Sequence, residues 1–525
     1  MLSKKLNKFI TLCKDLRAWL ALFAGLSLTF AYAPFNLWPL VFIAIALACY
    51  CTDVKSTKQV AIYGFIFSFG WFAAGISWVH VSIAQFGGLP LPASILLMAF
   101  LCGYLALYPT LAFICAHKFS QTPWQRVFLL ISGFAIFEFL RGKLLTGFPW
   151  LSFGYTLTDS PFSVLAPIMG EMGLTLLCVM LGACLYLLIT ARQYVLSIGA
   201  TTAIALLFLF NHFIQSPTYN NKVISTLLVQ GNIQQSLRWE PEQFWPTMSK
   251  YRDMTRRHWQ DVDLVVWPEA AIPEIEDIAY PFLEGLDKAA AFNNTAVITG
   301  IPDYQFNSKT VYNSLIVLGK QQAHDTEGHY QYLHRNRYQK HQLLPIGEFV
   351  PFEDILRPIA PLFNLAMSSF NRGERVQTNL VANGLHILPA ICYEITFSEL
   401  VRDNFTDESD LLFTVSNDAW FGDSHGPHQH MQIARMRALE LQRPLIRVTN
   451  NGITGVFDPI SKQQTALSQF TADTLKVDVK LIQGTTLFSQ YGQKPVWLFV
   501  SILLLYIIVV RVKASLMTKI ARNFL

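Results

Sequence analysis

Charged residues are scarce in this chain of 525 residues, where Asp, Glu, Lys and Arg make up 14% of the sequence and hydrophobic residues make up 52%. With a mean hydropathy of +0.34, the composition excludes an ordinary soluble protein, in which about a quarter of the residues are charged. The net charge of +5 is small for this length, and no basic stripe with interleaved aromatic side chains is present. We therefore expect no nucleic acid partner.

The few charges are distributed unevenly along the chain. Residues 18–215 are mainly Leu, Ala, Phe, Ile and Gly with isolated charges, whereas the stretch 219–493 holds most of the charged residues. About 20 mostly apolar residues are needed to cross the hydrocarbon core of a membrane. Windows of this kind predict about eight membrane-spanning helices, near residues 18–34, 36–52, 60–80, 89–116, 127–145, 162–190, 194–214 and 495–511.

The sequence thus predicts a membrane domain over residues 1–218 with about seven helices, a separate domain over 219–493, and a last membrane helix with a basic tail over 494–525. Lys and Arg gather before the first helix and after the second, fourth, sixth and last, and only Arg141 and Lys143 interrupt this alternation. Because cytoplasmic loops retain Lys and Arg, we expect both termini in the cytoplasm and the middle domain on the other side, which in a bacterium is the periplasm. The basic start has no convincing cleavage site behind it, so the first helix is interpreted as a retained signal-anchor.

Short β-branched runs that end in polar residues alternate with helical segments in the 219–493 domain. The expected strands are 223–232, 262–270, 295–304, 313–319, 386–394, 410–418 and 444–452. The expected helices are 241–260, 280–293 and 428–442. Strands that alternate with helices indicate a layered α/β domain whose strand ends carry the chemistry.

Cysteine is nearly absent from this domain, since Cys392 is the only one of the eight cysteines of the chain that lies there. It has no disulfide partner in the domain, and a lone thiol kept in an oxidising compartment indicates a use for it. The other seven lie in or beside apolar segments, where cysteine behaves as a small hydrophobe; they are Cys13, Cys49, Cys51, Cys102, Cys115, Cys178 and Cys184.

Three strand-end or loop positions carry reactive groups, namely Glu269 in VVWPEAAIP, Lys340 in YQKHQLLPIGEFVP and Cys392 in PAICYE. Taken singly, the cysteine predicts inert packing, the glutamate a helix cap or ion pair, and the lysine a solvated loop. Together they suit covalent acyl transfer, with a thiol nucleophile, a carboxylate that takes its proton and an amine that opposes the oxyanion. Glu269 can act as the base if its apolar neighbours raise its pKa toward neutrality. The main-chain N–H of Tyr393 is a natural second donor to the oxyanion.

Motifs spread over the whole chain match a known family. They are GFPWLSFGY (147–155), VQGNIQQSLRW (229–239), VVWPEAAIP (265–273), YQKHQLLPIGEFVPFE (338–353), ICYEITF (391–397), SNDAWFGDSHGPHQHMQIARMRALELQRP (416–444) and RVTNNGITG (447–455). The 219–493 domain resembles the nitrilase superfamily, whose members use a Glu–Lys–Cys triad on an αββα sandwich. The whole chain, membrane helices included, is similar to the apolipoprotein N-acyltransferase family.

This resemblance implies that Glu269 is the general base, Lys340 the amine that stabilises the oxyanion, and Cys392 the nucleophile that becomes a thioester. It also implies supporting or substrate-facing roles for four other residues, with Glu348 beside the lysine, Tyr393 and Glu394 shaping the site, and Trp239 on a mobile arm at the substrate entrance. In the implied reaction a phospholipid, typically phosphatidylethanolamine, donates an acyl chain to the cysteine. The amine of a diacylglyceryl cysteine at the N-terminus of an apolipoprotein then takes the chain, and no cofactor is implied.

Two other functions compete with this one. A membrane-tethered amidase of the nitrilase type would use the same triad with water as the acceptor and a small amide as the substrate. A transporter or lipid-flipping unit with an attached binding domain is disfavoured, because the membrane half lacks paired interrupted helices and the triad would have no use.

Two polar clusters lie outside the triad. HGPHQH at 425–430 lacks the spacing of a helical zinc site, so we expect no metal and interpret the segment as the loop that enters the helix 428–442. Glu138 and Arg141 lie at helical spacing near the end of the fifth membrane helix, where ionisable groups are expensive and often functional. A structural ion pair and a contact with a lipid headgroup are both compatible with that position.

Overall fold

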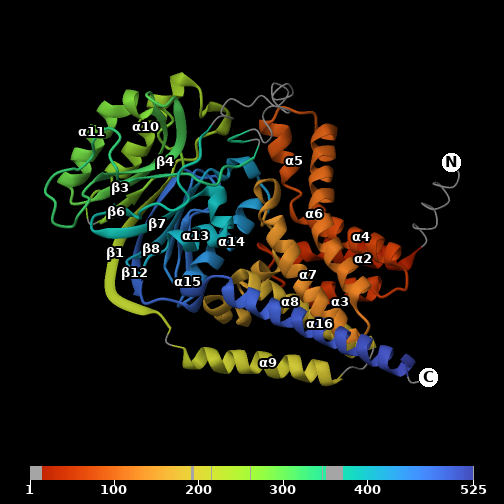
Figure 1. Ribbon diagram of the computed structural model, residues 1–525. Coiled ribbons are helices and arrows are strands. Elements are labelled where there is room, and N and C mark those ends of the chain that lie inside the picture. Colours follow the sequence, from red (N-terminus) through yellow and green to blue (C-terminus); the bar gives the residue numbers. More distant parts are fainter. Residues whose placement is uncertain are drawn as a thin grey trace. The chain divides into compact units, whose positions relative to one another are not determined.

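The computed structural model describes residues 15–190, 194–214, 216–260, 262–345, 347–349 and 370–523 (Figure 1). Of the basic residues expected before the first helix, Lys4, Lys5, Lys8 and Lys14 lie outside these ranges, as do Arg192 and the end of the motif at 338–353. The chain divides into two compact units. The helical unit comprises Met1–Ser77, Ile95–Ile214 and Tyr491–Leu525, and the two-sheet unit comprises Trp78–Ser94 and Gln215–Gln490.

Helices at all eight predicted windows account for the helical unit. They are α2 (Leu16–Ser27), α3 (Leu40–Thr52), α4 (Thr57–Gly75), α6 (Leu91–Phe119), α7 (Pro123–Arg141), α8 (Ala166–Thr190), α9 (Tyr194–Phe213) and α16 (Lys494–Asn523). Within the unit, α2 packs on α4, α3 and α7 pack on α8, and α16 packs on α7. The multi-pass helical architecture is thereby confirmed.

Fewer than eight of these helices are long enough to span a membrane as single straight segments. Among the described residues four qualify by length and composition, or up to five if α4 and the short helix that follows its 60° bend count as one span. Two predicted windows instead hold the shorter apolar helices Leu16–Ala31 and Leu40–Thr52. A helix rises about 1.5 Å per residue, so such segments fall short of a hydrocarbon core about 30 Å thick.

Glu138 and Arg141 form an ion pair inside the helical unit, where their side chains are 3% and 1% exposed. The guanidinium also donates hydrogen bonds to the backbone carbonyls of Phe148 and Trp150. These contacts fix the GFPWLSFGY segment against the end of α7, because a buried guanidinium holds whatever carbonyls satisfy it. Of the two roles left open by the sequence, the contacts therefore show the structural pair.

Two six-stranded sheets form the centre of the two-sheet unit. The first sheet has the order β12-β1-β2-β3-β4-β5, with β12 (Asp473–Gln483), β1 (Thr218–Gln230), β2 (Leu264–Val266), β3 (Ala296–Gln305), β4 (Thr310–Gly319) and β5 (Arg337–Gln339). The second has the order β11-β10-β9-β8-β7-β6, with β11 (Gln464–Ala466), β10 (Gly455–Phe457), β9 (Leu445–Thr449), β8 (Leu411–Ser416), β7 (Leu385–Ile391) and β6 (Leu380–Ala382). In each sheet three central strands run parallel, and antiparallel strands flank them.

Alternation along the strands explains how the two sheets are covered. Because successive side chains of a strand point to opposite faces, Ile224 and Leu228 of β1 enter the core shared with the second sheet, whereas Leu227 and Val229 enter the core shared with the helices. Helices α10 (Pro241–Arg256) and α11 (Glu276–Phe292) cover the first sheet, and α13 (Ser398–Asn404) and α14 (Gly426–Leu441) pack on the second (Figure 1). The predicted layered α/β domain, an αββα sandwich, is confirmed.

One segment of the two-sheet unit comes from between two membrane helices in the sequence. It contains the short α5 (Val79–Val81) and a π-helical turn, Ser82–Phe86. The hydroxyl of Ser82 donates to the carbonyl of Trp420 over 2.6 Å, and the indole of Trp78 donates to Gln429 over 3.2 Å. The first bond holds the loop after β8, which contributes to the site described below, and the second holds the first turn of α14.

Candidate active site

The three reactive residues follow strands of both sheets. Glu269 comes three residues after β2, Lys340 directly follows β5, and Cys392 directly follows β7. The first two therefore belong to the first sheet and the cysteine belongs to the second. The fold brings all three together, because Lys340 contacts Glu269 over 3.4 Å and Cys392 interacts electrostatically with both of them.

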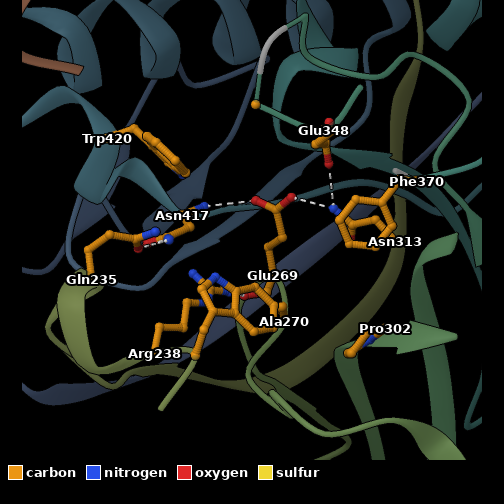
Figure 2. A pocket seen from close by; sticks show the side chains of 12 residues that line it. Gln235, Arg238, Glu269, Ala270, Pro302, Asn313, Glu348, Phe370, Asn417 and Trp420 are labelled. Atoms are coloured by element: carbon orange, nitrogen blue, oxygen red, sulfur yellow. Dashed lines mark hydrogen bonds between the residues drawn. The ribbon is translucent and has the colours of Figure 1, made fainter. Parts of the chain in front are cut away.

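Glu269 is buried, with 8% of its surface exposed, and both of its carboxylate oxygens are hydrogen-bonded (Figure 2). One oxygen, Oε1, accepts from the side-chain amide of Asn313 over 2.8 Å and from the Lys340 ammonium over 3.4 Å. The other, Oε2, accepts from the main-chain N–H of Asn417 over 3.0 Å. The backbone carbonyl of Glu269 accepts from the Arg238 guanidinium, so the residue is fixed at both ends.

Burial raises the pKa of Glu269, but the positive charges of Lys340 and Arg238 and the donors on Asn313 and Asn417 outweigh it and hold the pKa below its ordinary value. This direction is opposite to the one that the apolar neighbours in the sequence suggest. The carboxylate is ionised at rest and ready to accept a proton. It becomes a stronger base when its cationic neighbour turns toward another anion.

Lys340 lies between two carboxylates and is 1% exposed. Its ammonium donates to Oε1 of Glu348 over 2.9 Å, and that oxygen also accepts from the Asn313 amide over 2.8 Å. Glu348 is held in turn by the N–H of Leu344, which donates to Oε2 over 2.8 Å. Burial lowers the pKa of Lys340, but Glu348 and Glu269 more than offset this and keep the pKa well above its ordinary value. The lysine is therefore a permanent cation.

Cys392 is partly exposed and has an unusual backbone, with a φ of 53° at the first residue of a 3-10 turn, Cys392–Thr396. A non-glycine residue in the left-handed region is strained by about 1–2 kcal/mol, and such strain gathers at functional sites. Burial and the Glu269 charge raise the pKa of the thiol to about 12, although Lys340 and the Ser416 hydroxyl next to the sulfur act against them. Cys392 is therefore a thiol at rest, and a nucleophilic role requires that its proton leaves during the attack.

Glu394 ties the cysteine turn to the segment that carries the lysine. It is fully buried, and Oε2 accepts from the N–H of Ile391 over 2.8 Å and from the hydroxyl of Tyr338 over 3.0 Å. Its Oε1 accepts from the N–H groups of His341 and Gln342 over 2.7 and 3.0 Å. One carboxylate thus sets the positions of two reactive groups at once.

Tyr393 follows the nucleophile and is buried, with its ring packed edge-on against Phe397 at 5.1 Å between centroids. Trp239 lies near the end of the loop after β1, where the Arg238 guanidinium stands 5.6 Å from the centre of its ring. All seven residues named from the sequence thus lie in or around one site.

An open pocket of about 520 Å³, a volume that includes the solvent at its mouth, lies over the carboxylates (Figure 2). Its walls include the aromatic side chains of Trp239, Phe370 and Trp420 and the polar groups of Glu269, Glu348, Arg238, Asn313 and Asn417. Apolar walls around a few charged groups suit a substrate with an apolar chain and a polar reacting centre.

Sequence reasoning missed several contributors to the site. Asn417 and Trp420 lie inside the recognised motif at 416–444, so the motif could have identified them as candidate site residues. Asn313 lies within β4 among apolar residues, and nothing in its sequence context marks it.

The histidines of HGPHQH belong to the start of α14 and its cap, and the described residues contain no group of three or more His, Cys, Asp or Glu that could hold a metal ion.

Comparison with known proteins covers both units. Residues 24–184 match the family model "Apolipoprotein N-acyltransferase N-terminal domain", and residues 228–486 match "Carbon-nitrogen hydrolase". The apolipoprotein N-acyltransferase of Shewanella oneidensis is 46% identical over 496 residues, which is 93% of this chain and 95% of that protein. Those of Photobacterium profundum and Vibrio parahaemolyticus are 45% and 44% identical and cover 92% of this chain each, with 93% and 95% of their own lengths covered.

These matches confirm the resemblance seen in the motifs and favour acyl transfer over amide hydrolysis, because the match extends through the helical unit as well as the carbon-nitrogen hydrolase unit. The protein is therefore a membrane-associated acyltransferase with a nitrilase-type catalytic fold. The chain belongs to the apolipoprotein N-acyltransferase family.

Proposed function

We propose that this protein moves an acyl chain from a membrane phospholipid, through a thioester on Cys392, to the α-amine of a diacylglyceryl cysteine at the N-terminus of an apolipoprotein. Phosphatidylethanolamine is the expected donor. The products are a lysophospholipid and a triacylated lipoprotein. The observation that carries this proposal is the convergence of Glu269, Lys340 and Cys392 on one buried site.

In the first half-reaction the Cys392 sulfur attacks the ester carbonyl of the phospholipid while the thiol proton passes to Glu269. A tetrahedral intermediate forms with its negative charge on the former carbonyl oxygen. When it collapses, the ester C–O bond breaks, the lysophospholipid alkoxide leaves and takes the proton from Glu269, and the acyl chain remains on sulfur. In the second half-reaction the amine attacks the thioester, Glu269 takes its proton, and the sulfur leaves and is reprotonated.

Lys340 stabilises the oxyanion of each intermediate, with the N–H of Tyr393 as the second donor. A preorganised donor of this kind is worth about 3 kcal/mol in the transition state. Two carboxylates already surround the ammonium, at 2.9 Å for Glu348 and 3.4 Å for Glu269. As the oxyanion draws the ammonium toward itself, the pull of Lys340 on Glu269 weakens, so the base strengthens at the moment when it has to hold the proton.

The location of the enzyme follows from its substrates and from the distribution of basic residues. We assign residues 1–218 and 494–525 to the inner membrane with both termini in the cytoplasm, and residues 219–493 to the periplasm. Both substrates carry acyl chains that are anchored in the bilayer. A catalytic domain that acts on them has to be held at the lipid surface, which accounts for a multi-helix membrane part in place of a single tether.

A trapping experiment tests the proposal. Purified enzyme incubated with acyl-labelled phosphatidylethanolamine is expected to carry label that hydroxylamine releases, whereas Cys392→Ala is expected to carry none. Cys115→Ala is the matched control, since this cysteine is also partly exposed but lies on α6. If the wild-type enzyme forms no adduct within a single turnover, the acyltransferase mechanism is refuted.

Trp239 is proposed to act at the substrate entrance, on an arm that moves as substrates exchange. Trp239→Ala is expected to leave thioester formation measurable while it slows delivery of the chain to the lipoprotein. The two half-reactions are measured separately, by labelled enzyme and by labelled lipopeptide. Equal loss of both would contradict a role specific to the exchange of substrates.

A further inference from the structure

Four buried polar side chains lie directly behind the nucleophile, and the reaction steps above use none of them. They are Ser416 at the end of β8, Asp418 at the start of the following turn, His430 on α14 and Arg447 on β9. Each is at most 1% exposed. Burial of groups as polar as these is costly unless they are hydrogen-bonded, so their bonds to one another and to Cys392 require an explanation.

The donors and acceptors in the cluster determine which nitrogen of His430 carries the proton. Nε2 lies 3.1 Å from the backbone carbonyl of Cys392, which can only accept, so Nε2 donates. Nδ1 lies 2.9 Å from a guanidinium nitrogen of Arg447, which can only donate, and 3.1 Å from Oδ1 of Asp418, which already accepts from Ser416. Because burial and the Arg447 charge lower the pKa of His430, Nδ1 carries no proton and accepts from the guanidinium. The imidazole is therefore the neutral Nε2–H tautomer, with its proton directed at the nucleophilic residue.

Asp418 and Arg447 maintain this state. The guanidinium donates to Oδ2 of Asp418 over 2.8 Å, and the hydroxyl of Ser416 donates to Oδ1 over 2.7 Å. Burial and the Arg447 charge lower the pKa of His430, and they outweigh Asp418, whose Oδ1 lies 3.1 Å from Nδ1. Burial raises the pKa of Asp418, but the Arg447 charge and the Ser416 hydroxyl hold it well below its ordinary value. A permanent ion pair thus faces a neutral imidazole.

The cluster meets the nucleophile at two points. His430 donates to the carbonyl of Cys392, and the Ser416 oxygen lies 3.3 Å from its sulfur. On the other side, Glu394 accepts from the N–H of Ile391. Hydrogen bonds thus hold the backbone on both sides of the left-handed residue Cys392. A strained backbone conformation of this kind persists only where the surrounding structure enforces it.

We propose that His430 is a positioning residue for acyl transfer, which holds the carbonyl of Cys392 through its Nε2–H and so fixes the turn that presents the sulfur to Glu269 and Lys340. Asp418 and Arg447 act through it by setting its tautomer and orientation. This inference concerns the same nucleophile as the proposed function and rests on it.

The test compares two substitutions that differ in the donor. Glutamine can place an amide N–H where Nε2 lies, whereas leucine cannot donate at all. His430→Leu is expected to slow single-turnover thioester formation about tenfold, the effect of one lost hydrogen bond at a strained turn, without changing the KM for phosphatidylethanolamine. His430→Gln is expected to stay within about threefold of the wild-type rate. His428→Gln is the matched control on the same helix, where the side chain contacts Gln469, and it is expected to react like the wild type.

Two results overturn the inference. One is a folded His430→Leu enzyme that acylates at the wild-type rate, and the other is a glutamine variant that loses as much as the leucine variant. Absence of a thioester in the wild-type enzyme would instead refute the proposed function. If the variants do not fold, a measurement on the wild-type enzyme still tests the inference. The enzyme is labelled with ¹⁵N-histidine, and the His430 ring is identified as the one whose NMR signals shift when Cys392 is alkylated. This ring is expected to show the Nε2–H tautomer at pH 7. An imidazolium or an Nδ1–H tautomer at this ring contradicts the assignment.

Discussion

Removal of the charge on Glu348 is the clearest test of the proposed mechanism, because it distinguishes an electrostatic role of this side chain from a role in packing alone. Glu348→Gln keeps an oxygen within reach of the Lys340 ammonium but removes one of its two counter-charges. In the wild type the ammonium lies 2.9 Å from Glu348 and 3.4 Å from Glu269, with all three side chains at most 12% exposed. In the variant the lysine has only the catalytic base as a carboxylate partner.

The expected loss follows from this rearrangement. At 3 to 4 Å and an effective dielectric constant of about 20, two unit charges attract by about 4–6 kcal/mol before desolvation and the retained hydrogen bond are subtracted. Lys340 then pairs more tightly with Glu269, which weakens the base and keeps the ammonium from the oxyanion. Since the oxyanion contact is worth about 3 kcal/mol when intact, a loss of about 1–3 kcal/mol is expected, which slows thioester formation about 5- to 150-fold.

The assay is single-turnover labelling of Cys392 by acyl-labelled phosphatidylethanolamine, followed over time. Glu284→Gln is the matched control, because it removes a carboxylate that pairs with a lysine over 2.8 Å on the exposed face of α11. It is expected to leave the rate unchanged. A Glu348→Gln enzyme that labels as fast as the control would show that Lys340 needs no second counter-charge, and the argument about the oxyanion would fail.

Three further perturbations give distinct outcomes. Because burial and Glu269 raise the pKa of Cys392 to about 12, the rate of its alkylation by iodoacetamide in the free enzyme is expected to rise about tenfold per pH unit from pH 7 to 10, and a plateau near pH 8.5 would contradict this. Glu394→Gln turns an amide toward main-chain N–H groups that now bond to a carboxylate, so the free energy of unfolding measured in denaturant is expected to fall by about 2–4 kcal/mol. Asn313→Ala removes a donor that lowers the pKa of Glu269, so the acid limb of the pH–rate profile is expected to move to higher pH, and a shift to lower pH would refute the assignment of the base.

The strands of the two-sheet unit could largely be predicted from the sequence, because buried parallel strands leave continuous β-branched runs. All seven predicted strands and all three predicted helices correspond to observed elements. The strands that were missed, β5, β6, β10, β11 and β12, lie at or next to the sheet edges. β12 is the longest of them, and its DTLKVDVKLIQ sequence is largely exposed or half-exposed, so its apolar pattern is weak.

The electrostatics of the site could not be predicted from local sequence. Apolar neighbours of Glu269 suggested a raised pKa, yet the groups that set it approach from far along the chain. Arg238 is 31 residues away and Lys340 is 71 residues away in the sequence. A pKa depends on the charges that the fold brings close, and the sequence around a residue contains little information about them.

The proposed catalysis depends on the packing of one sheet against the other. The proposed base and oxyanion lysine follow strands of the first sheet, whereas the nucleophile and the N–H of Asn417 follow strands of the second. That N–H donates to Oε2 of Glu269 over 3.0 Å and so joins the sheets at the reacting atoms. The apolar core between them, to which Ile391 next to the nucleophile and Val266 near the base both contribute, therefore sets the distance between thiol and carboxylate. One sheet cannot slide over the other without loss of contacts, because a protein interior is densely packed. This rigidity keeps the proposed proton acceptor on one sheet within reach of the thiol on the other.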